Sequence, residues 1–331
     1  MLLTIAIPTF NRNQILLESL KHLLPQLTPE CRLLIIDNCS PTPVAQTLEP
    51  LLRQYPQVAV EIVRNRVNIG ANSNIMRCFE VCETPWVWVL GDDDTPCPDA
   101  VKIILELIHE RPECIYFNFS AGYYSGFTRR EQPIVTRGTR EFVEKVDAIA
   151  IVLFLSSGVH HVGRMRDNIR LGYAYAHTQP NFIPLLTSLG ESEICYLSDQ
   201  QIVTWNPPSY ENQWSFVYFG LGIMALLELP LQPDVRRTLA RKILDSLPPP
   251  GYFALQLLLE ALKENDSRSI LYLFDQLCYR LYYFDDNLLR KCKLPLYRIM
   301  LRFPRATYQL AKCIKPDEAR KYVLEDRFGR I

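Results

Sequence analysis

The stretch WVWVLGDDD, residues 86–94, constrains the fold of this chain more than any other part of its sequence. Its first five residues are apolar and mostly aromatic or β-branched, which predicts a strand buried on both faces, as in a parallel sheet. Gly91 ends this strand, and three consecutive aspartates follow it: Asp92, Asp93 and Asp94. Ligands of open α/β sheets bind beyond the carboxyl ends of the strands, where these carboxylates would lie.

Three adjacent carboxylates repel one another and resist desolvation, so they favour a bound cation or an exposed loop. Acidic clusters in loops are more often solvated surface than binding sites. The position of residues 92–94 directly after the most apolar strand of the chain favours binding. We therefore predict that Asp92, Asp93 and Asp94 hold a divalent metal against a phosphorylated ligand, and that Asp94 is an exposed loop carboxylate that contributes little packing.

Strand and helix patterns alternate through the first part of the chain with a period of roughly thirty residues, which is typical of βαβ units. This alternation predicts an α/β fold with a doubly wound, mainly parallel sheet flanked by helices. The predicted strands are 2–8, 31–37, 58–63, 86–90 and 114–119, and the predicted helices are 14–24, 44–54, 70–82 and 99–110.

After Ser120 the pattern loosens, and the segment NPPS at 206–209 is the clearest boundary in the chain. We expect one domain over residues 1–205 and an all-helical C-terminal domain over 206–331. The further predicted elements are helices 141–154 and 182–189, strands 158–163, 194–197 and 202–205, and the C-terminal helices 214–229, 234–247, 252–263 and 269–284.

The composition argues against nucleic acid as a partner, because Lys+Arg and Asp+Glu are balanced at 36 each. Ten cysteines form no CxxC pair, and Cys78 and Cys82 share the apolar side of a predicted helix. This pattern predicts packed, reduced cysteines and a cytoplasmic protein. We expect no signal peptide before the first strand, and the longest apolar run, 216–231, is interrupted by Glu228 and Pro230.

Several polar segments have alternatives that the sequence leaves open. The loop 8–12 is either a simple strand-to-helix turn or a source of backbone amides and a guanidinium for a nucleotide. Asp37 ends a buried strand, where it either caps the next helix or accepts hydrogen bonds from a nucleobase or a ribose. The segment 65–72 fits a plain helix entry. Neither GxGxxG nor GxxxxGK[ST] occurs in the required context, which argues against nicotinamide, flavin and P-loop sites.

The histidines give weaker indications. His177 lies in an aromatic segment, YAYAHTQP at 173–180, and a lone loop histidine is more often structural than catalytic. His160 and His161 are adjacent in a predicted strand, so one should face inward and the other outward. No Ser-His-Asp or Cys-His arrangement can be identified from spacing.

Taken together, four segments resemble glycosyltransferase family 2, whose members have the GT-A fold and transfer a sugar from a nucleotide-sugar donor. They are TIAIPTFNR at 4–12, LIIDNCS at 34–40, NIGAN at 68–72 and LGDDD at 90–94. Each segment is loosely specific, but their order and spacing carry the resemblance, which covers residues 1–200 and thins after Ser120. The resemblance extends to members that act as sugar transferases of bacterial surface polysaccharide.

This resemblance implies roles for particular residues. Asp92 and Asp93 would lie against the ribose and the sugar-phosphate, and Asp94 would bind Mg²⁺ or Mn²⁺ in a DXD-type motif. A metal there would stabilise the charge that develops on the departing diphosphate. The residues implied in binding the nucleotide-sugar donor are Pro8, Thr9, Phe10, Asn11, Arg12, Asp37, Asn68, Asn72, Asp92 and Asp93.

The general base is where the chain departs from the family pattern. Many members carry a Glu-Asp pair late in the domain, and no such pair occurs between Ser156 and Gln201. Some polysaccharide transferases have an aromatic-His segment instead, which implies His177 as the base here, with Asp93 as the second catalytic residue. Asp167 and Glu191 remain carboxylate alternatives.

We therefore expect an inverting, metal-dependent glycosyltransferase that moves a sugar to a glycan or a lipid-linked acceptor in polysaccharide, lipopolysaccharide or capsule assembly. Inversion follows from the resemblance and from a single displacement. One alternative is a nucleotidyltransferase that makes nucleotide sugars, but its Gly- and Arg-rich first loop is absent here. The other is a catalytically silent module that binds a nucleotide sugar or a glycan, which the missing Glu-Asp pair keeps open.

The segment 287–315 has a composition of its own. It contains eight basic residues and no acidic residue, interleaved with aromatic and aliphatic side chains. Such a mixture is typical of a segment that lies on an anionic bilayer, although a solvated helical face is the alternative. We expect this segment to bring the protein to the inner face of a membrane as a peripheral protein.

Overall fold

The computed structural model of the chain describes residues 1–121, 130–146, 154–175, 180–204, 222–246 and 267–314, with Val152, Ala254, Leu257 and Leu258. Its strands are β1 Leu3–Thr9, β2 Cys31–Asp37, β3 Ala59–Arg64, β4 Trp86–Val89, β5 Thr95–Pro96, β6 Cys114–Asn118, β7 Ile134–Arg137, β8 Gly158–His161, β9 Ile194–Leu197 and β10 Val203–Thr204. Its α-helices include α1 Asn13–Leu23, α2 Val44–Leu52, α3 Ala71–Val81, α4 Ala100–Glu110, α5 Gly138–Lys145, α7 Val162–Met165, α8 Ile169–Ala174, α9 Phe182–Ser188, α11 Pro233–Ser246, α13 Ser267–Arg280, α14 Leu288–Arg302 and α15 Pro304–Ile314.

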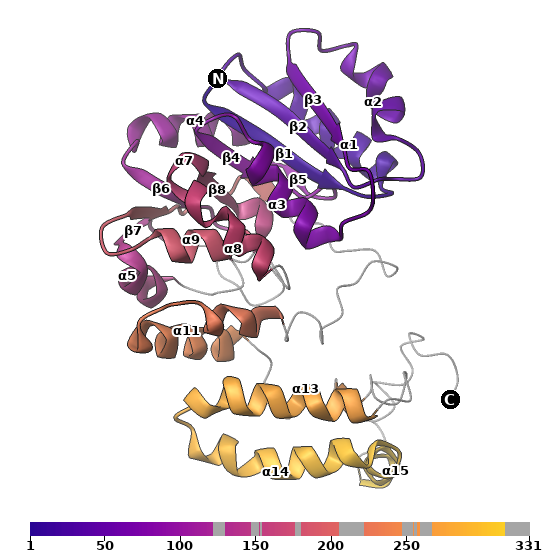
Figure 1. The fold of residues 1–331 in the computed structure, drawn as a ribbon, viewed down its shortest axis with the longest axis vertical. Helices are drawn as coiled ribbons and strands as arrows, with labels where there is room; N and C mark the ends of the chain where they lie inside the picture. Colours follow the sequence, from indigo (N-terminus) through magenta and orange to yellow (C-terminus); the bar gives the residue numbers. More distant parts are fainter. Residues whose placement is uncertain are drawn as a thin grey trace.

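Eight strands form one mixed sheet in the order β3-β2-β1-β4-β8-β6-β9-β7 (Figure 1). The first four strands in this order are parallel, and β6 and β9 are also parallel to each other. Strand β8 is antiparallel to both of its neighbours, β4 and β6, and β7 is antiparallel to β9. The predicted α/β class and mainly parallel sheet are therefore confirmed, and the two antiparallel strands are an addition to the prediction.

The orientation of β8 decides which loops meet at the functional edge. Trp86 pairs with His161 and Trp88 pairs with Val159, so the start of β8 lies beside the end of β4. The residues that precede β8 therefore reach the same sheet edge as the residues that follow β4. On the other side of β8, Gly158 pairs with Asn118 at the end of β6.

Both faces of the sheet are buried, which explains the uninterrupted apolar runs of its strands. Successive residues of one strand point to opposite faces, so Val87 and Val89 pack in one core and Trp88 packs in the other. Helices α1 and α4 contribute to the core that holds Trp88, and α3 and α9 contribute to the opposite one.

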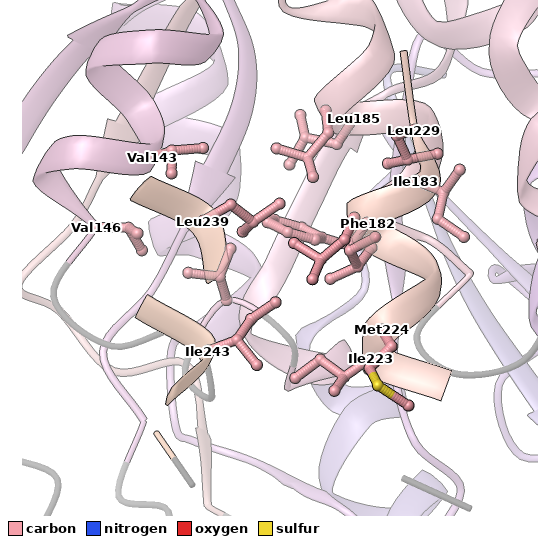
Figure 2. Packing of buried hydrophobic residues seen from close by; sticks show 14 of the residues in the cluster. Val143, Val146, Phe182, Ile183, Leu185, Ile223, Met224, Leu229, Leu239 and Ile243 are labelled. Atoms are coloured by element: carbon pink, nitrogen blue, oxygen red, sulfur yellow. The ribbon is translucent and has the colours of Figure 1, made fainter. Parts of the chain in front are cut away.

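The described elements beyond residue 222 are all helical, as predicted. Helix α11 packs on α5 and α9 through Leu239 and Ile243, which lie near Val143 and Phe182 (Figure 2). Lys242 in α11 adds a hydrogen bond from its Nζ to the carbonyl oxygen of Val146, 2.7 Å away. The helices and the sheet thus share a continuous core. The predicted boundary at 206 lies outside the described residues and stays a prediction.

Several predicted elements have different bounds. The strand expected at 158–163 ends at His161, because the chain turns into α7 there. The strand expected at 202–205 pairs with β5, directly after the aspartates, in a separate two-stranded sheet. The helix expected at 141–154 spans Gly138–Lys145 in the described residues. The helices expected at 214–229 and 252–263 lie largely outside them.

Two sequence expectations about buried side chains are confirmed. His160 is fully buried against Phe79 and Tyr116, and burial lowers its pKa to about 3, whereas His161 lies partly exposed beside Trp86. All ten cysteines are free thiols, and Cys78 and Cys82 are buried in the core. Among the described helices, none is both long and apolar enough to cross a bilayer.

Candidate active site

The predicted polar residues at the end of β1, in the loop after it and after β4 lie together at the carboxyl edge of the sheet. Thr9 Oγ1 donates a hydrogen bond to Asp92 Oδ2 at 2.6 Å. Arg12 Nη1 donates to Asp92 Oδ1 at 2.8 Å and to Asp93 Oδ2 at 3.0 Å. The backbone aligns these groups, because β1 and β4 are neighbours in the sheet and the Leu90 amide donates to the Ala6 carbonyl at 2.9 Å. The loop after β1 is therefore in direct contact with the aspartates.

Asp92 is buried and both of its carboxylate oxygens accept hydrogen bonds from the chain. Its side chain is 6% exposed, and burial raises its pKa against the opposing effect of Arg12. Burial would lower the pKa of Arg12, but Asp92 and Asp93 outweigh it and raise that pKa. The guanidinium is thus a fixed cation that neutralises part of the acidic triplet.

The exposure predicted for Asp94 is wrong, because Asp94 is buried as Asp92 is. Its Oδ2 accepts a hydrogen bond of 2.5 Å from Ser156 Oγ, and its carbonyl accepts one of 2.8 Å from Ser19 Oγ. Asp93 differs, with a side chain that is 31% exposed. The loop turns back toward the sheet after Gly91, which explains the burial of Asp92 and Asp94.

Ser156 is a site residue that sequence reasoning missed. It lies just before β8, and its Oγ accepts a hydrogen bond from the Gly91 amide at 2.8 Å while it donates to Asp94. Its carbonyl accepts from Trp88 Nε1 at 2.8 Å, which fixes the backbone. A Cβ at position 91 would lie 2.6 Å from Asp94 Oδ2, so this glycine permits the close approach. No local motif marks Ser156, since only the antiparallel docking of β8 brings it here.

Asp37, at the end of β2, is surrounded by donors of the chain itself. Its Oδ1 accepts from the Ser40 amide at 2.8 Å, and its Oδ2 accepts from Arg64 Nη1 at 2.6 Å and from the Val44 amide at 3.3 Å. Burial alone would raise the pKa of Asp37, but the hydrogen bonds from Ser40, Val44 and Arg64 outweigh it and lower that pKa. These contacts are those of a turn and helix-capping residue, and a role in base or ribose binding stays a prediction.

A group of asparagines holds the loop before α3. Asn68 Oδ1 accepts hydrogen bonds from Asn38 Nδ2 at 2.8 Å and from the Gly70 amide at 2.9 Å. Asn65 Nδ2 bridges Asn38 Oδ1 and Asn74 Oδ1, at 3.0 and 2.8 Å. Gly70 has φ of 84°, a conformation that favours glycine. The predicted donor-binding residue Asn68 is therefore fixed in place, and Asn72 lies in the first turn of α3.

The other predicted residues of the loop 8–12 lie at the same edge. No described side-chain hydrogen bond joins them to the aspartates. Phe10 exposes 41% of its surface, and Pro8 lies in β1 beside the end of β2. Asn11 has φ of 54°, and its amide donates to Ser40 Oγ at 2.9 Å, which joins the loops after β1 and β2. The exposed Phe10 ring is the largest apolar surface that this loop offers to a ligand.

The base predicted at His177 lies outside the described residues. Glu191 precedes β9, whose first residue pairs with Cys114 at the start of β6, so it lies at the opposite edge of the sheet from the aspartates. Asp167 follows β8, and its neighbour Asn168 bonds Ser188 at 2.9 Å near that same edge. The geometry therefore does not fit either carboxylate alternative as the base.

In the described part of the chain, a divalent metal at this edge would need further ligands besides the aspartates. Within the parts of the chain that the structure describes, no three His, Cys, Asp or Glu side chains form a complete ligand set. Mg²⁺ and similar ions are commonly held by one or two carboxylates together with phosphate oxygens and water. Asp94 and Asp93 offer hard oxygen ligands of that kind, so the donor set is suited to a metal whose remaining ligands come from a diphosphate.

Comparison with known proteins finds a matching family, two curated relatives and several solved structures. Residues 4–171 match the family described as glycosyl transferase family 2. The chain is 26% identical over 136 residues to an uncharacterized glycosyltransferase of Haemophilus influenzae, covering 40% of this chain and 44% of that protein. It is 26% identical over 106 residues to abequosyltransferase RfbV of Salmonella typhimurium, covering 31% and 32%. The chain therefore spans less than half the length of these curated relatives.

Solved structures show the same fold. The crystal structure of S. aureus TarS 1–349 in complex with UDP-GlcNAc has a TM-score of 0.65 and 15% identity, and covers 94% of this chain and 92% of that chain. A second crystal structure of S. aureus TarS 1–349 gives a TM-score of 0.63 at 13% identity. At such identities the likeness establishes the GT-A architecture alone.

Proposed function

This chain belongs to glycosyl transferase family 2, and we propose that it transfers a sugar from a nucleotide-sugar donor with inversion and with the help of a divalent metal. The observation that carries the proposal is the contact of Thr9 and Arg12 with the aspartates at the carboxyl edge of the sheet. Four predicted segments meet around this edge, although they lie far apart in the sequence.

In the proposed complex, the loop after β1 and the ends of β2 and β3 bind the nucleoside part of the donor. Phe10 offers an exposed ring for stacking, and Arg64 and Arg12 bring positive charge beside Asp37 and Asp92. Asp93, the most exposed carboxylate of the triplet, would contact the ribose or the sugar-phosphate.

Asp94 would hold Mg²⁺ or Mn²⁺ in this proposal, oriented by the hydrogen bond from Ser156. A divalent metal between Asp94 and the diphosphate would stabilise the negative charge of the leaving group. Arg12 supports the same task, because its fixed cation faces the aspartates at the place where the diphosphate would lie.

We retain His177 as the proposed general base that takes the proton from the acceptor hydroxyl, with Asp93 as the second catalytic residue. If His177 has its ordinary pKa of about 6.5, kcat should fall as the pH drops below that value. His177→Ala should remove this limb of the pH profile and spare donor binding, whereas Glu191→Gln should leave the profile unchanged. If Glu191→Gln changes the pH profile and His177→Ala does not, His177 is not the general base.

The acceptor in this proposal is a glycan or a lipid-linked sugar of a bacterial surface polysaccharide. This class is suggested by the partial match to an abequosyltransferase and by the basic C-terminal segment. A lipid-linked acceptor would be met at the inner face of a membrane, so we extend the proposal to a peripheral protein of the cytoplasm. The ten free thiols are consistent with that reducing compartment.

The decisive experiment is a panel of UDP-, GDP-, dTDP- and CDP-sugars tested by thermal shift, with and without Mn²⁺. A donor present at 100 times its Kd should stabilise the protein by about 2.7 kcal/mol, and the stabilisation should depend on the metal. Hydrolysis of the stabilising donor then separates an enzyme from a silent binding module. Release of pyrophosphate from a nucleoside triphosphate and a sugar phosphate would instead identify a nucleotidyltransferase. Failure of every donor to stabilise the protein would overturn the proposal.

A further inference from the structure

The outer face of α14 carries an apolar stripe that has no described partner within the chain. It consists of Leu288, Leu289, Cys292, Leu296, Ile299 and Phe303, and we call it the α14 stripe. Its five large residues are 56–75% exposed. Among the described residues, nine of the fourteen exposed large hydrophobic side chains lie between Tyr272 and Leu310, so exposed apolar surface is concentrated at this end of the molecule.

The stripe is distinct from the face by which α14 packs. Leu301 is fully buried, and Leu294 and Tyr297 pack against the core shared with α13. At 3.6 residues per turn, the stripe and this packing face point about 160° apart. Helix α14 is therefore apolar on two sides, and the described residues pack against only one of them.

Basic side chains border the stripe. Lys291 and Arg302 lie on one flank, and Lys293 lies on the other, by their positions on the helix. No acidic residue occurs from Asn287 to Lys315. Of the basic residues in this stretch, Arg298 is bound to Asp275 by hydrogen bonds of 2.7 and 2.9 Å, and Arg290 pairs with Asp285. Lys291 Nζ donates to the carbonyl oxygen of Tyr283 at 3.2 Å, a contact that does not neutralise its charge, so the borders of the stripe are cationic.

We propose that the α14 stripe docks the protein on an anionic lipid bilayer, with leucine, isoleucine and phenylalanine side chains inserted among the acyl chains. An interfacial helix of this kind combines a row of large apolar side chains with Lys and Arg at its borders, whose long stems reach the headgroups. The position of the helix suits this role, because α14 lies at the end of the molecule remote from β1–β3, with α13 between it and α11 (Figure 1).

Charge decides between a bilayer and a second copy of this chain. In a symmetric dimer the same surface of both copies forms the interface, so two α14 stripes would bring their basic borders together. No acidic residue between 287 and 315 would compensate this charge. An anionic bilayer offers both an apolar interior and negative headgroups to the same surface. The inference rests on the peripheral placement proposed above and names the surface that would provide it. It does not depend on which sugar is transferred, so the vesicle experiments and the donor experiments can fail separately.

Binding is tested by sedimentation with vesicles of phosphatidylglycerol and phosphatidylcholine in equal parts, and with phosphatidylcholine alone. The wild-type protein should bind the anionic vesicles, and salt should weaken the binding. Lys291→Glu/Lys293→Glu/Arg302→Glu should reduce the partition coefficient on the order of 100-fold. Arg298 is left unchanged because it links α14 to α13. The control variant Lys21→Glu/Arg53→Glu/Lys102→Glu makes the same change in charge on α1, at the C-terminal end of α2 and on α4, and should bind like wild type.

Insertion is tested with the native cysteines. Cys292 lies within the stripe, whereas Cys39 and Cys97 lie in the sheet region. Anionic vesicles should slow the alkylation of Cys292, followed by mass spectrometry, and leave the rates of Cys39 and Cys97 unchanged. Leu296→Gln/Ile299→Gln/Phe303→Gln should abolish binding, while Ile15→Gln/Val135→Gln, at exposed sites of the sheet region, should not.

Three results would overturn the proposal. The first is the absence of wild-type binding to anionic vesicles at low salt. The second is binding without protection of Cys292, which would mean a charged surface that does not insert. The third is a concentration-dependent dimer in the absence of lipid that the Leu296→Gln/Ile299→Gln/Phe303→Gln variant no longer forms, because the stripe would then be occupied by a second copy.

Discussion

The carboxyl edge of the sheet and the outer face of α14 both depart from the usual rule that charged side chains are exposed and apolar ones are buried. The sheet edge buries charge, and α14 exposes apolar surface. At the sheet edge, the charged groups Asp92 and Asp94 are buried and their oxygens accept hydrogen bonds from Thr9, Arg12 and Ser156. On α14, large apolar side chains lie in solvent. A buried charge is tolerated only with such partners, whereas exposed apolar surface has a cost that an external partner can remove. The side chains of the sheet edge are thus held in place by the chain before a ligand binds. The apolar side chains of α14 can be buried only by a partner.

The largest effect should come from removing the charge of Asp94 while keeping its shape. In Asp94→Asn the amide oxygen can still accept from Ser156, but it is a poor metal ligand. Turnover of the donor should fall on the order of 10³-fold, which corresponds to roughly 4 kcal/mol of transition-state stabilisation. Steady-state kinetics with saturating Mn²⁺ provide the measurement.

Asp94→Ala sharpens the same prediction, because it also removes the acceptor of Ser156. We expect it to lower the free energy of unfolding by about 1–3 kcal/mol as well, an effect absent from an exposed carboxylate. Near-wild-type turnover of Asp94→Asn, or full activity of the wild type in EDTA, would remove the metal from the proposed mechanism.

A second effect should appear in stability when Asp92 loses its cation. Arg12→Met leaves this buried carboxylate without its ion pair and should lower the free energy of unfolding by about 3 kcal/mol in urea titrations. Arg53→Met, which breaks an exposed pair with Glu49 on α2, should change it far less. The double variant Arg12→Met/Asp92→Asn should regain much of the loss. Equal costs at Arg12 and Arg53 would contradict the distinction between buried and exposed pairs.

A smaller effect should follow from deleting the hydroxyl that orients Asp94. Ser156→Ala should weaken Mn²⁺ binding about tenfold, as removal of such supporting hydrogen bonds commonly does. Titration of Mn²⁺ by electron paramagnetic resonance in the presence of nucleoside diphosphate measures this without relying on turnover. Ser157→Ala deletes the neighbouring hydroxyl, which bonds Phe154 and Asn118 instead, and should bind Mn²⁺ as wild type does. If both variants weaken binding alike, Ser156 does not act through Asp94.

The smallest effect concerns pH and Asp37. Hydrogen bonds hold its pKa below 3.8, so the ionised carboxylate stabilises the folded chain above that value, and this contribution is lost as the pH falls through the lowered pKa. The difference in unfolding free energy between wild type and Asp37→Asn should therefore shrink as the pH is lowered from about 5 to 2. For a group whose pKa is raised in the folded chain, such as Asp92, the dependence of stability on pH has the opposite sign. A difference that grows on acidification would mean that the contacts of Asp37 do not favour its ionised form.

The strands that carry the site could be predicted because each is a continuous apolar run that ends in a polar motif, as residues 86–94 do. The burial of Asp92 and Asp94 and the role of Ser156 could not, since they depend on the direction of β8, which an apolar strand does not reveal. For α14, the basic and apolar composition was visible in the sequence. Its outward face was not, because only the packing of Leu294, Tyr297 and Leu301 on α13 shows which side is left exposed.

The insertion of β8 between β4 and β6 has a consequence for the order in which the protein assembles. The hydrogen bond from Ser156 to Asp94 joins residues 62 positions apart, so it cannot form early from local contacts. During synthesis from the amino terminus, β1, β2, β3 and β4 can pair before β8 has emerged from the ribosome, with the aspartates not yet anchored. Contacts of such long sequence separation form slowly. The last strand to enter the sheet centre is therefore the one that gives Asp94 its final position, and donor binding should be acquired late in folding.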